Sequence, residues 1–123
     1  MDASYYVERL IDTKPTPVVI CDLEYRIVFM NTCAKKRYKK SQGEDIVGKK
    51  LHAFVDIETL SKIDMVVEWF KESKDNNKVF SQHTESNTDV YIIAIRDLDG
   101  ELIGFTDIFE EREPDSGETF DLD

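Results

Sequence analysis

The sequence lacks several features that would assign it to a specialised class of protein. Its two cysteines, at positions 21 and 33, are too few for a disulfide framework and too far apart for a redox or zinc pair. It has no apolar run of the ~18 residues that a membrane span needs. Its N-terminus carries Asp2 and Glu8, where a secretory signal would be basic and then apolar. These absences predict a cytoplasmic protein with reduced thiols and no membrane partner.

Positive charge is also in short supply. The chain has 16 Lys and Arg against 26 Asp and Glu, a net charge of −10, which argues against nucleic acid as a partner. Half of this excess lies in residues 111–123, where six acids accompany one base, and we predict a flexible acidic tail there. A run of five basic residues between positions 35 and 40 is either a patch for an anionic ligand or an acidic partner, or a solvated helix face that pairs weakly with the acidic tail, and we favour the second interpretation.

What the chain does have is enough apolar material for one core. Its 123 residues are 41% hydrophobic and 11% aromatic, values typical of a single globular domain. In residues 1–12, Tyr6 and Leu10 share one stripe at helical spacing, and Pro15 then prevents the helix from continuing. We therefore predict an N-terminal amphipathic helix over residues 1–12 and a domain over residues 13–110.

The remaining pattern predicts an α+β domain with an antiparallel sheet. Two apolar runs separated by a polar turn indicate a hairpin, and a helix ending near Gly43 follows, with further helical turns up to residue 55. Apolar residues at helical spacing predict the longest helix over 56–73. The predicted strands are 18–21, 27–30, 79–84, 90–96 and 102–109, and Asp99-Gly100 is the clearest turn signal.

Two of these strands are apolar on both faces. Residues 90–95 and 102–105 do not alternate between apolar and polar, so both faces of the sheet must be covered. The middle helices can cover one face, and the N-terminal helix about half of the other. We expect a second subunit to cover the remainder.

Three segments resemble the PAS domain family. Residues Pro17–Asn31 resemble its first hairpin and helix-capping Asn, Ile46–Lys49 its hydrophobic-Gly-Lys step, and Arg96–Gly104 its final hairpin. The resemblance covers Leu10 to Glu110. It implies a PAS-like five-stranded antiparallel sheet with helices on one face enclosing a small-molecule pocket. It also implies that the N-terminal helix, and often a second subunit, lies on the opposite face.

The resemblance allows two cofactors of the family to be tested. The segment Gly48–Phe54 lacks the photoreactive cysteine of the light-sensing flavin members, and residues 58–73 lack the histidine that commonly binds haem. The sequence therefore argues against both groups and leaves the cofactor unknown. His52 is either a ligand in a rearranged pocket or an exposed imidazole at a helix junction, and we favour the second interpretation.

Strand parity, combined with the resemblance, predicts the faces of the sheet. Val19 and Cys21 are expected to face the pocket, where Cys21 either senses an electrophile or oxidant or, as we favour, is a small buried hydrophobe. The full set of candidate pocket residues is Val19, Cys21, Phe29, Leu51, His52, Ile63, Val67, Val90, Ile92 and Leu102. The candidate dimer or partner surface comprises Tyr6, Leu10, Ile20, Tyr91, Ile93, Ile103 and Phe105.

No catalytic or metal-binding constellation is evident. The sequence shows neither paired carboxylates, nor a nucleophile with a base, nor a metal-ligand cluster at a convincing spacing. We therefore predict a protein that is not an enzyme, and the resemblance implies a sensory module that binds a small ligand and acts through a homodimer and a signalling-protein partner. The alternatives are a ligand-free adaptor with a filled interior and a small cavity enzyme, which the presence and lining of a cavity distinguish.

Overall fold

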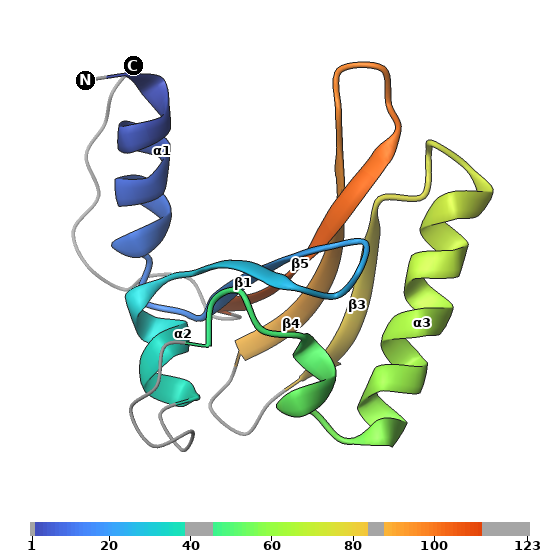
Figure 1. Ribbon diagram of the computed structural model, residues 1–123, viewed down its shortest axis with the longest axis horizontal. Coiled ribbons are helices and arrows are strands. Elements are labelled where there is room, and N and C mark those ends of the chain that lie inside the picture. Colours follow the sequence, from blue (N-terminus) through green and yellow to red (C-terminus); the bar gives the residue numbers. More distant parts are fainter. Residues whose placement is uncertain (1, 39–45, 84–87, 112–123) are drawn as a thin grey trace.

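The computed structural model describes residues 2–38, 46–83 and 88–111 (Figure 1). The elements are α1 (Ala3–Asp12), β1 (Val18–Asp22), β2 (Ile27–Met30), α2 (Thr32–Arg37), the 3₁₀ turn η1 (Leu51–Ala53), α3 (Ile57–Glu72), β3 (Lys78–His83), β4 (Thr88–Arg96) and β5 (Leu102–Glu111). The predicted α+β class is confirmed. The predicted helix end at Gly43 and the acidic tail beyond residue 111 lie outside the described residues. Among the described helices, none is long and apolar enough to cross a membrane.

The five strands form one antiparallel sheet in the order β2-β1-β5-β4-β3, so the last strand lies in the centre. We call the face packed against α2, η1 and α3 the inner face, and the opposite face the outer face (Figure 1). Asp107 on β5 pairs with Val19 on β1 and with Ile92 on β4. These three residues form a row across the middle of the inner face.

Asn31 joins the start of α2 to the first strand. Its side chain is fully buried, and its Oδ1 accepts hydrogen bonds from the backbone N–H groups of Ala34, at 2.9 Å, and Val18, at 3.0 Å. Its Nδ2 donates to the carbonyl of Thr16 at 2.9 Å. One amide thus caps α2 and satisfies backbone groups of the preceding segment.

Arg96 fixes the C-terminal end of α3 against the sheet. Its guanidinium donates to the carbonyl oxygens of Phe70, at 2.7 Å, Ser73, at 3.0 Å, and Asn76, at 3.0 Å. The last carbonyls of a helix have no partner within the helix, so this arginine supplies the missing donors. The same guanidinium reaches the carbonyl of Gly100, whose φ of 85° makes the turn between β4 and β5.

Helix α1 does not cover the outer face, so this part of the sequence prediction is wrong. No residue of α1 is buried, and its stripe residues Tyr6 and Leu10 are 62% and 73% exposed. The helix stands apart from the sheet on the side away from α3 (Figure 1). Its apolar stripe is therefore not buried by the described part of the chain.

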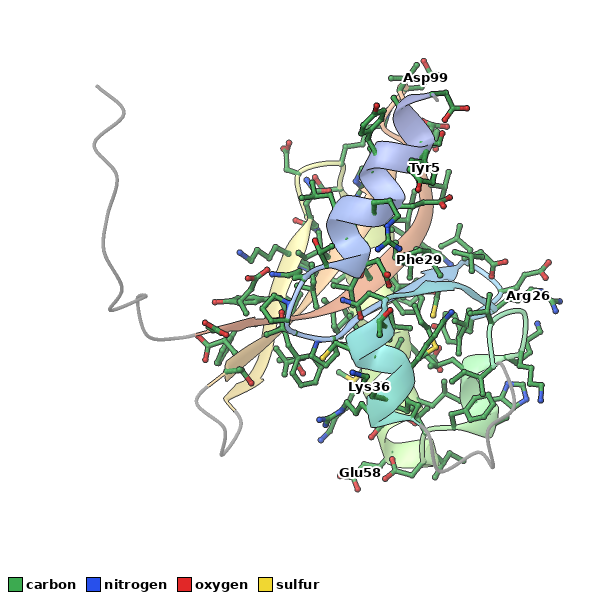
Figure 2. The ribbon with its side chains drawn as sticks, turned by 90° about the vertical axis from the view of Figure 1, so that its left-hand side faces the viewer. Tyr5, Arg26, Phe29, Lys36, Glu58 and Asp99 are labelled. Atoms are coloured by element: carbon green, nitrogen blue, oxygen red, sulfur yellow. The ribbon has the colours of Figure 1, made fainter. Side chains whose placement is uncertain are left out.

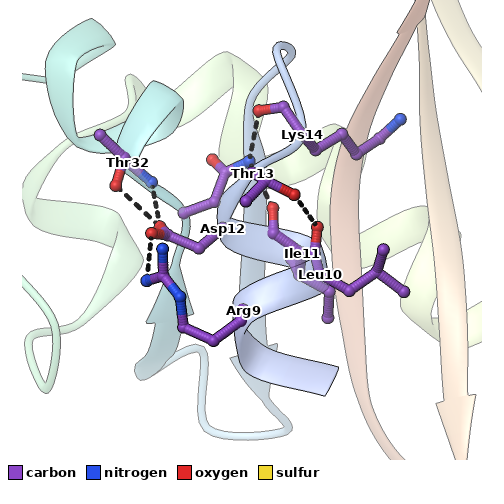
Figure 3. A network of polar contacts seen from close by, with 8 residues as sticks. Arg9, Leu10, Ile11, Asp12, Thr13, Lys14 and Thr32 are labelled. Atoms are coloured by element: carbon purple, nitrogen blue, oxygen red, sulfur yellow. Dashed lines mark hydrogen bonds and ion pairs between the residues drawn. The ribbon is translucent and has the colours of Figure 1, made fainter. Parts of the chain in front are cut away.

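The C-terminal end of α1 is nevertheless fixed by hydrogen bonds to the start of α2. The Asp12 carboxylate accepts hydrogen bonds from the Thr32 backbone N–H, at 2.7 Å, and hydroxyl, at 2.8 Å, and from the Arg9 guanidinium, at 2.9 Å (Figure 3). These contacts, those to Thr32 above all, hold the pKa of Asp12 below its usual value. They join the end of α1 to the start of α2, so α1 is fixed at one end and exposed along its length.

Candidate functional site

A cavity of about 270 Å³ lies between the inner face and the covering elements α2, η1 and α3. Strands β1, β4 and β5, with Ser81 of β3, form its floor, and α2, η1 and α3 form its sides. The floor is mostly apolar, with one carboxyl group in its centre. The lining residues are Val19, Cys21, Arg37, Tyr38, Leu51, Val55, Thr59, Lys62, Ile63, Ser81, Val90, Ile92, Phe105, Asp107 and Phe109.

The structure brings six of the ten candidate pocket residues to this cavity: Val19, Cys21, Leu51, Ile63, Val90 and Ile92. The other four do not line it. His52 is exposed on η1, whereas Val67 and Leu102 pack in the hydrophobic core beside the cavity. Phe29 is paired with Ile20 and lies on the outer face; Figure 2, which is viewed from the α1 side, shows it near the base of α1.

Two β-bulges explain why Phe29 and Phe105 lie on the opposite faces from those predicted. In β2, Val28 is an extra residue opposite the step between Ile20 and Cys21, and it is 49% exposed. In β5, Ile103 is the extra residue, and it is 50% exposed. A bulge shifts the alternation of faces by one residue, so every later side chain of the strand points to the opposite face from the one expected.

The placement of Phe105 on the partner surface is therefore wrong. Phe105 is buried on the inner face, opposite Cys21, with its ring edge-to-face against that of Tyr25 at a centroid distance of 5.4 Å. The other candidates for that surface are accessible in varying degree. Ile20, Tyr91 and Ile93 lie half-buried on the outer face, and Ile103, Tyr6 and Leu10 are exposed.

Asp107 is a cavity-lining acid that is absent from the residues predicted for the pocket. Burial raises its pKa to about 6, and attraction to Arg37 offsets part of that rise. Among the described residues, no group donates a hydrogen bond to its carboxylate. The signal in the sequence is an acid at the alternate position between Phe105 and Phe109, and the Ile103 bulge concealed which face it occupies.

Basic side chains stand at the rim of the cavity on two sides. The Arg37 guanidinium lies over the Phe109 ring, 4.8 Å from its centroid, and the Lys62 ammonium lies 3.7 Å from the Glu58 carboxylate. Both cations are on exposed residues. Tyr38 stands behind Arg37, and burial raises the pKa of its hydroxyl. Part of the basic run between positions 35 and 40 thus reaches the rim of the cavity, although the side chain of Arg37 remains exposed to solvent.

Cys21 lies on the cavity floor as an unreactive group. Burial, followed by the nearby Asp107 carboxylate, raises the pKa of its thiol to about 12. Because the thiolate is the reactive form of cysteine, this environment favours the interpretation of Cys21 as a small hydrophobe. Within the ranges that the structure describes, no three His, Cys, Asp or Glu residues gather as a metal site.

Tyr25 connects helix α3 to strand β5 at the edge of the cavity. It occupies the turn before β2 with a φ of 64°, and its hydroxyl donates a hydrogen bond to the Asp64 carboxylate on α3. Its ring packs against Phe105, which is part of the lining. The Tyr25–Asp64 pair therefore couples the position of α3 to the sheet.

Comparisons with known proteins agree on one family. A family model of the PAS domain matches residues 15–111. The C-terminal domain of a Streptococcus mutans protein is similar, with a TM-score of 0.68 and 14% identity, over 88% of this chain and 84% of that one. So is a PAS domain from Colwellia psychrerythraea, with a TM-score of 0.63 and 14% identity, over 89% and 97%.

A third similar structure is a sensory box sensor histidine kinase from Vibrio cholerae, with a TM-score of 0.56 and 15% identity, over 87% of each chain. A comparison with curated protein sequences finds no match. The five-stranded sheet, the helices on its inner face and the match over residues 15–111 lead to one conclusion. The chain belongs to the PAS domain family, whose members are typically sensory modules of signal-transduction proteins.

Proposed function

We propose that this PAS domain is a ligand sensor without catalytic activity of its own. A small molecule would occupy the cavity, and a protein in contact with the outer face would respond to the occupancy. The observation that carries the proposal is the cavity of about 270 Å³ with a single carboxyl group on an apolar floor. Ligand pockets are mostly apolar with few polar groups.

The strands themselves connect the cavity to the outer face. Because side chains alternate along a strand, Asp107 faces the cavity while its neighbour Ile108 faces outward, and Ile92 and Ile93 are related in the same way. A ligand that favours one position of these strands moves both faces together. The response is a shift between two arrangements of the sheet, which the ligand biases by its difference in affinity for them.

The partner on the outer face is proposed to be a second copy of the chain. The outer face carries half-buried apolar residues such as Tyr91 and Ile93, and α1 carries an apolar stripe that is largely exposed. Two copies related by a twofold axis can each place α1 on the outer face of the other, which covers both surfaces. The contact between Asp12 and Thr32 fixes the C-terminal end of α1, so the direction of the helix is set before a partner binds. A signalling protein would respond to this dimer.

The filled-interior adaptor and the cavity enzyme are the competing hypotheses. The cavity favours the sensor over the adaptor. For an enzyme, the described lining offers one desolvated carboxyl group, Asp107, with Cys21 and Tyr38 held in their protonated forms by raised pKa values. That set provides an acid or a base but no activated nucleophile.

Native mass spectrometry of the protein purified without added ligand tests the sensor. Val55 lines the cavity between η1 and α3, so Val55→Trp should fill it, whereas Val28→Trp adds the same bulk at the exposed bulge of β2. We expect a bound small molecule on the wild type and on Val28→Trp and none on Val55→Trp. Equal ligand content in Val55→Trp and wild type would contradict the proposal.

Sedimentation of matched variants tests the dimer. Ile93→Lys places a charge on the outer face, and Ile57→Lys places one on a residue of α3 that is 82% exposed. The wild type and Ile57→Lys should sediment as dimers and Ile93→Lys as a monomer. A monomeric wild type, or a dimeric Ile93→Lys, would overturn the second-copy assignment.

A further inference from the structure

The Asp107 carboxylate has no partner among the described residues, although it lies in the centre of the sheet. It sits on the middle strand between Val19 on one side and Ile92 on the other, both of which are apolar. Phe105 and Phe109 flank it along β5 on the same face. Asp107 is half-buried, and a carboxyl group that is partly withdrawn from water is normally hydrogen-bonded, because losing water without a replacement partner is unfavourable.

The nearest described cation does not fill this role. Arg37 attracts Asp107 electrostatically, but its guanidinium lies over the Phe109 ring and makes no ion pair with the carboxylate. Lys62 lies beside Glu58 on the exposed side of α3. The unmet acceptor therefore points into the cavity, with apolar side chains around it.

From this arrangement we propose that the cavity takes a small primary amine with an apolar body, whose ammonium group pairs with Asp107. This assignment rests on the proposed ligand-sensing function and names the class of ligand. The apolar body would lie against Val19, Ile63 and Ile92. Within the low-dielectric floor, an ammonium-carboxylate hydrogen bond is stronger than one from a neutral donor.

The separation of charge between the floor and the rim of the cavity favours an amine over an acid at the floor. Near neutral pH most of the Asp107 population is ionised, since its pKa is about 6, and the floor then carries a negative charge that Arg37 attracts from the rim but that no ion pair among the described residues neutralises. The titratable or charged groups that face the cavity from the packed elements are Cys21, Arg37, Tyr38 and Lys62. The two cations are at the exposed rim, where solvent and salt screen their repulsion of an incoming ammonium.

Calorimetric titration with three probes of one shape tests the assignment. Phenethylamine, 2-phenylethanol and phenylacetate share the phenyl body and differ in the terminal group. At pH 7.5 we expect phenethylamine to bind wild-type protein at least tenfold more tightly than either of the others. Asp107→Asn should remove that preference, and Asp75→Asn, which deletes an exposed negative charge outside the cavity, should retain it.

A second measurement uses only the wild type and so does not depend on the folding of a variant. Lowering the pH from 7.5 to 5 protonates Asp107, so the affinity for phenethylamine should fall by about tenfold while that for 2-phenylethanol stays constant. Equal affinity for amine and alcohol, a preference for phenylacetate, or binding of no probe would each overturn the amine assignment. The bound mass in the native spectrum and its loss in Val55→Trp would still report whether the cavity holds another ligand.

Discussion

Replacing Asn31 with alanine should destabilise the protein more than the loss of a helix cap explains. The substitution removes the cap of α2 at Ala34, which is worth about 1 kcal/mol. It also leaves the buried Val18 N–H and Thr16 carbonyl without their partners at 3.0 and 2.9 Å. An unsatisfied buried group costs about 1–3 kcal/mol. Because these effects share one side chain and overlap, we expect a total loss of about 3–4 kcal/mol.

Urea unfolding followed by circular dichroism measures this loss as a lower midpoint at unchanged slope. Asp56→Ala is the matched control, because Asp56 caps α3 through Thr59 on the exposed surface and holds no other segment. The cost of Asn31→Ala should clearly exceed that of Asp56→Ala. Equal costs would refute the claim that Asn31 joins β1 and α2 through its buried bonds.

Three other substitutions or treatments follow from the site. Burial raises the pKa of Asp107 to about 6, so the protonated carboxyl contributes its full stability below about pH 4, and that contribution is lost as the pH rises through 6. Asp107→Asn should therefore raise the free energy of unfolding at pH 7.5 by about 2 kcal/mol and leave it unchanged at pH 4. No gain in the free energy of unfolding at pH 7.5 would contradict this reasoning. Native protein treated with iodoacetamide at pH 8 should be alkylated at Cys33 and spared at Cys21, whose pKa is about 12; peptide mapping that finds equal labelling would place Cys21 in a different environment. Asp12→Ala should speed hydrogen exchange throughout α1 while the sheet exchanges as before, and unchanged exchange in α1 would show that the contacts to Thr32 do not hold it.

The elements themselves could be predicted from the sequence, because each long element carries a repeating apolar pattern. Helix α3, expected over 56–73, spans Ile57–Glu72, and β4 and β5 lie within two residues of their predicted ends. An amphipathic stripe, however, shows only that one side of a helix is apolar, and it does not indicate which surface packs against that side. For this reason α1 was predicted correctly as a helix and wrongly as a cover for the outer face.

The faces of the strands could be predicted only up to the first bulge. The extra residue of the β1–β2 pair lies in β2, so β1 keeps its alternation, and Val19 and Cys21 both line the cavity as expected. Strict alternation beyond Ile103 would place Phe105 and Asp107 on the outer face, and the bulge reverses this. No local residue pattern predicts that bulge. The position of the Asp107 carboxyl group on the inner face is therefore defined only by the register of β4 and β5.

The central claim is that the cavity and the outer face respond together. Methyl NMR spectra of isoleucine-labelled protein test it, with the probe that binds most tightly of the three phenyl compounds added in steps. Ile63 and Ile92 report on the cavity, Ile93 and Ile108 on the outer face, and the exposed Ile57 serves as the control. The account predicts that cavity and outer-face signals shift along the same saturation curve while Ile57 stays in place. Shifts confined to the cavity signals would contradict transmission through the sheet.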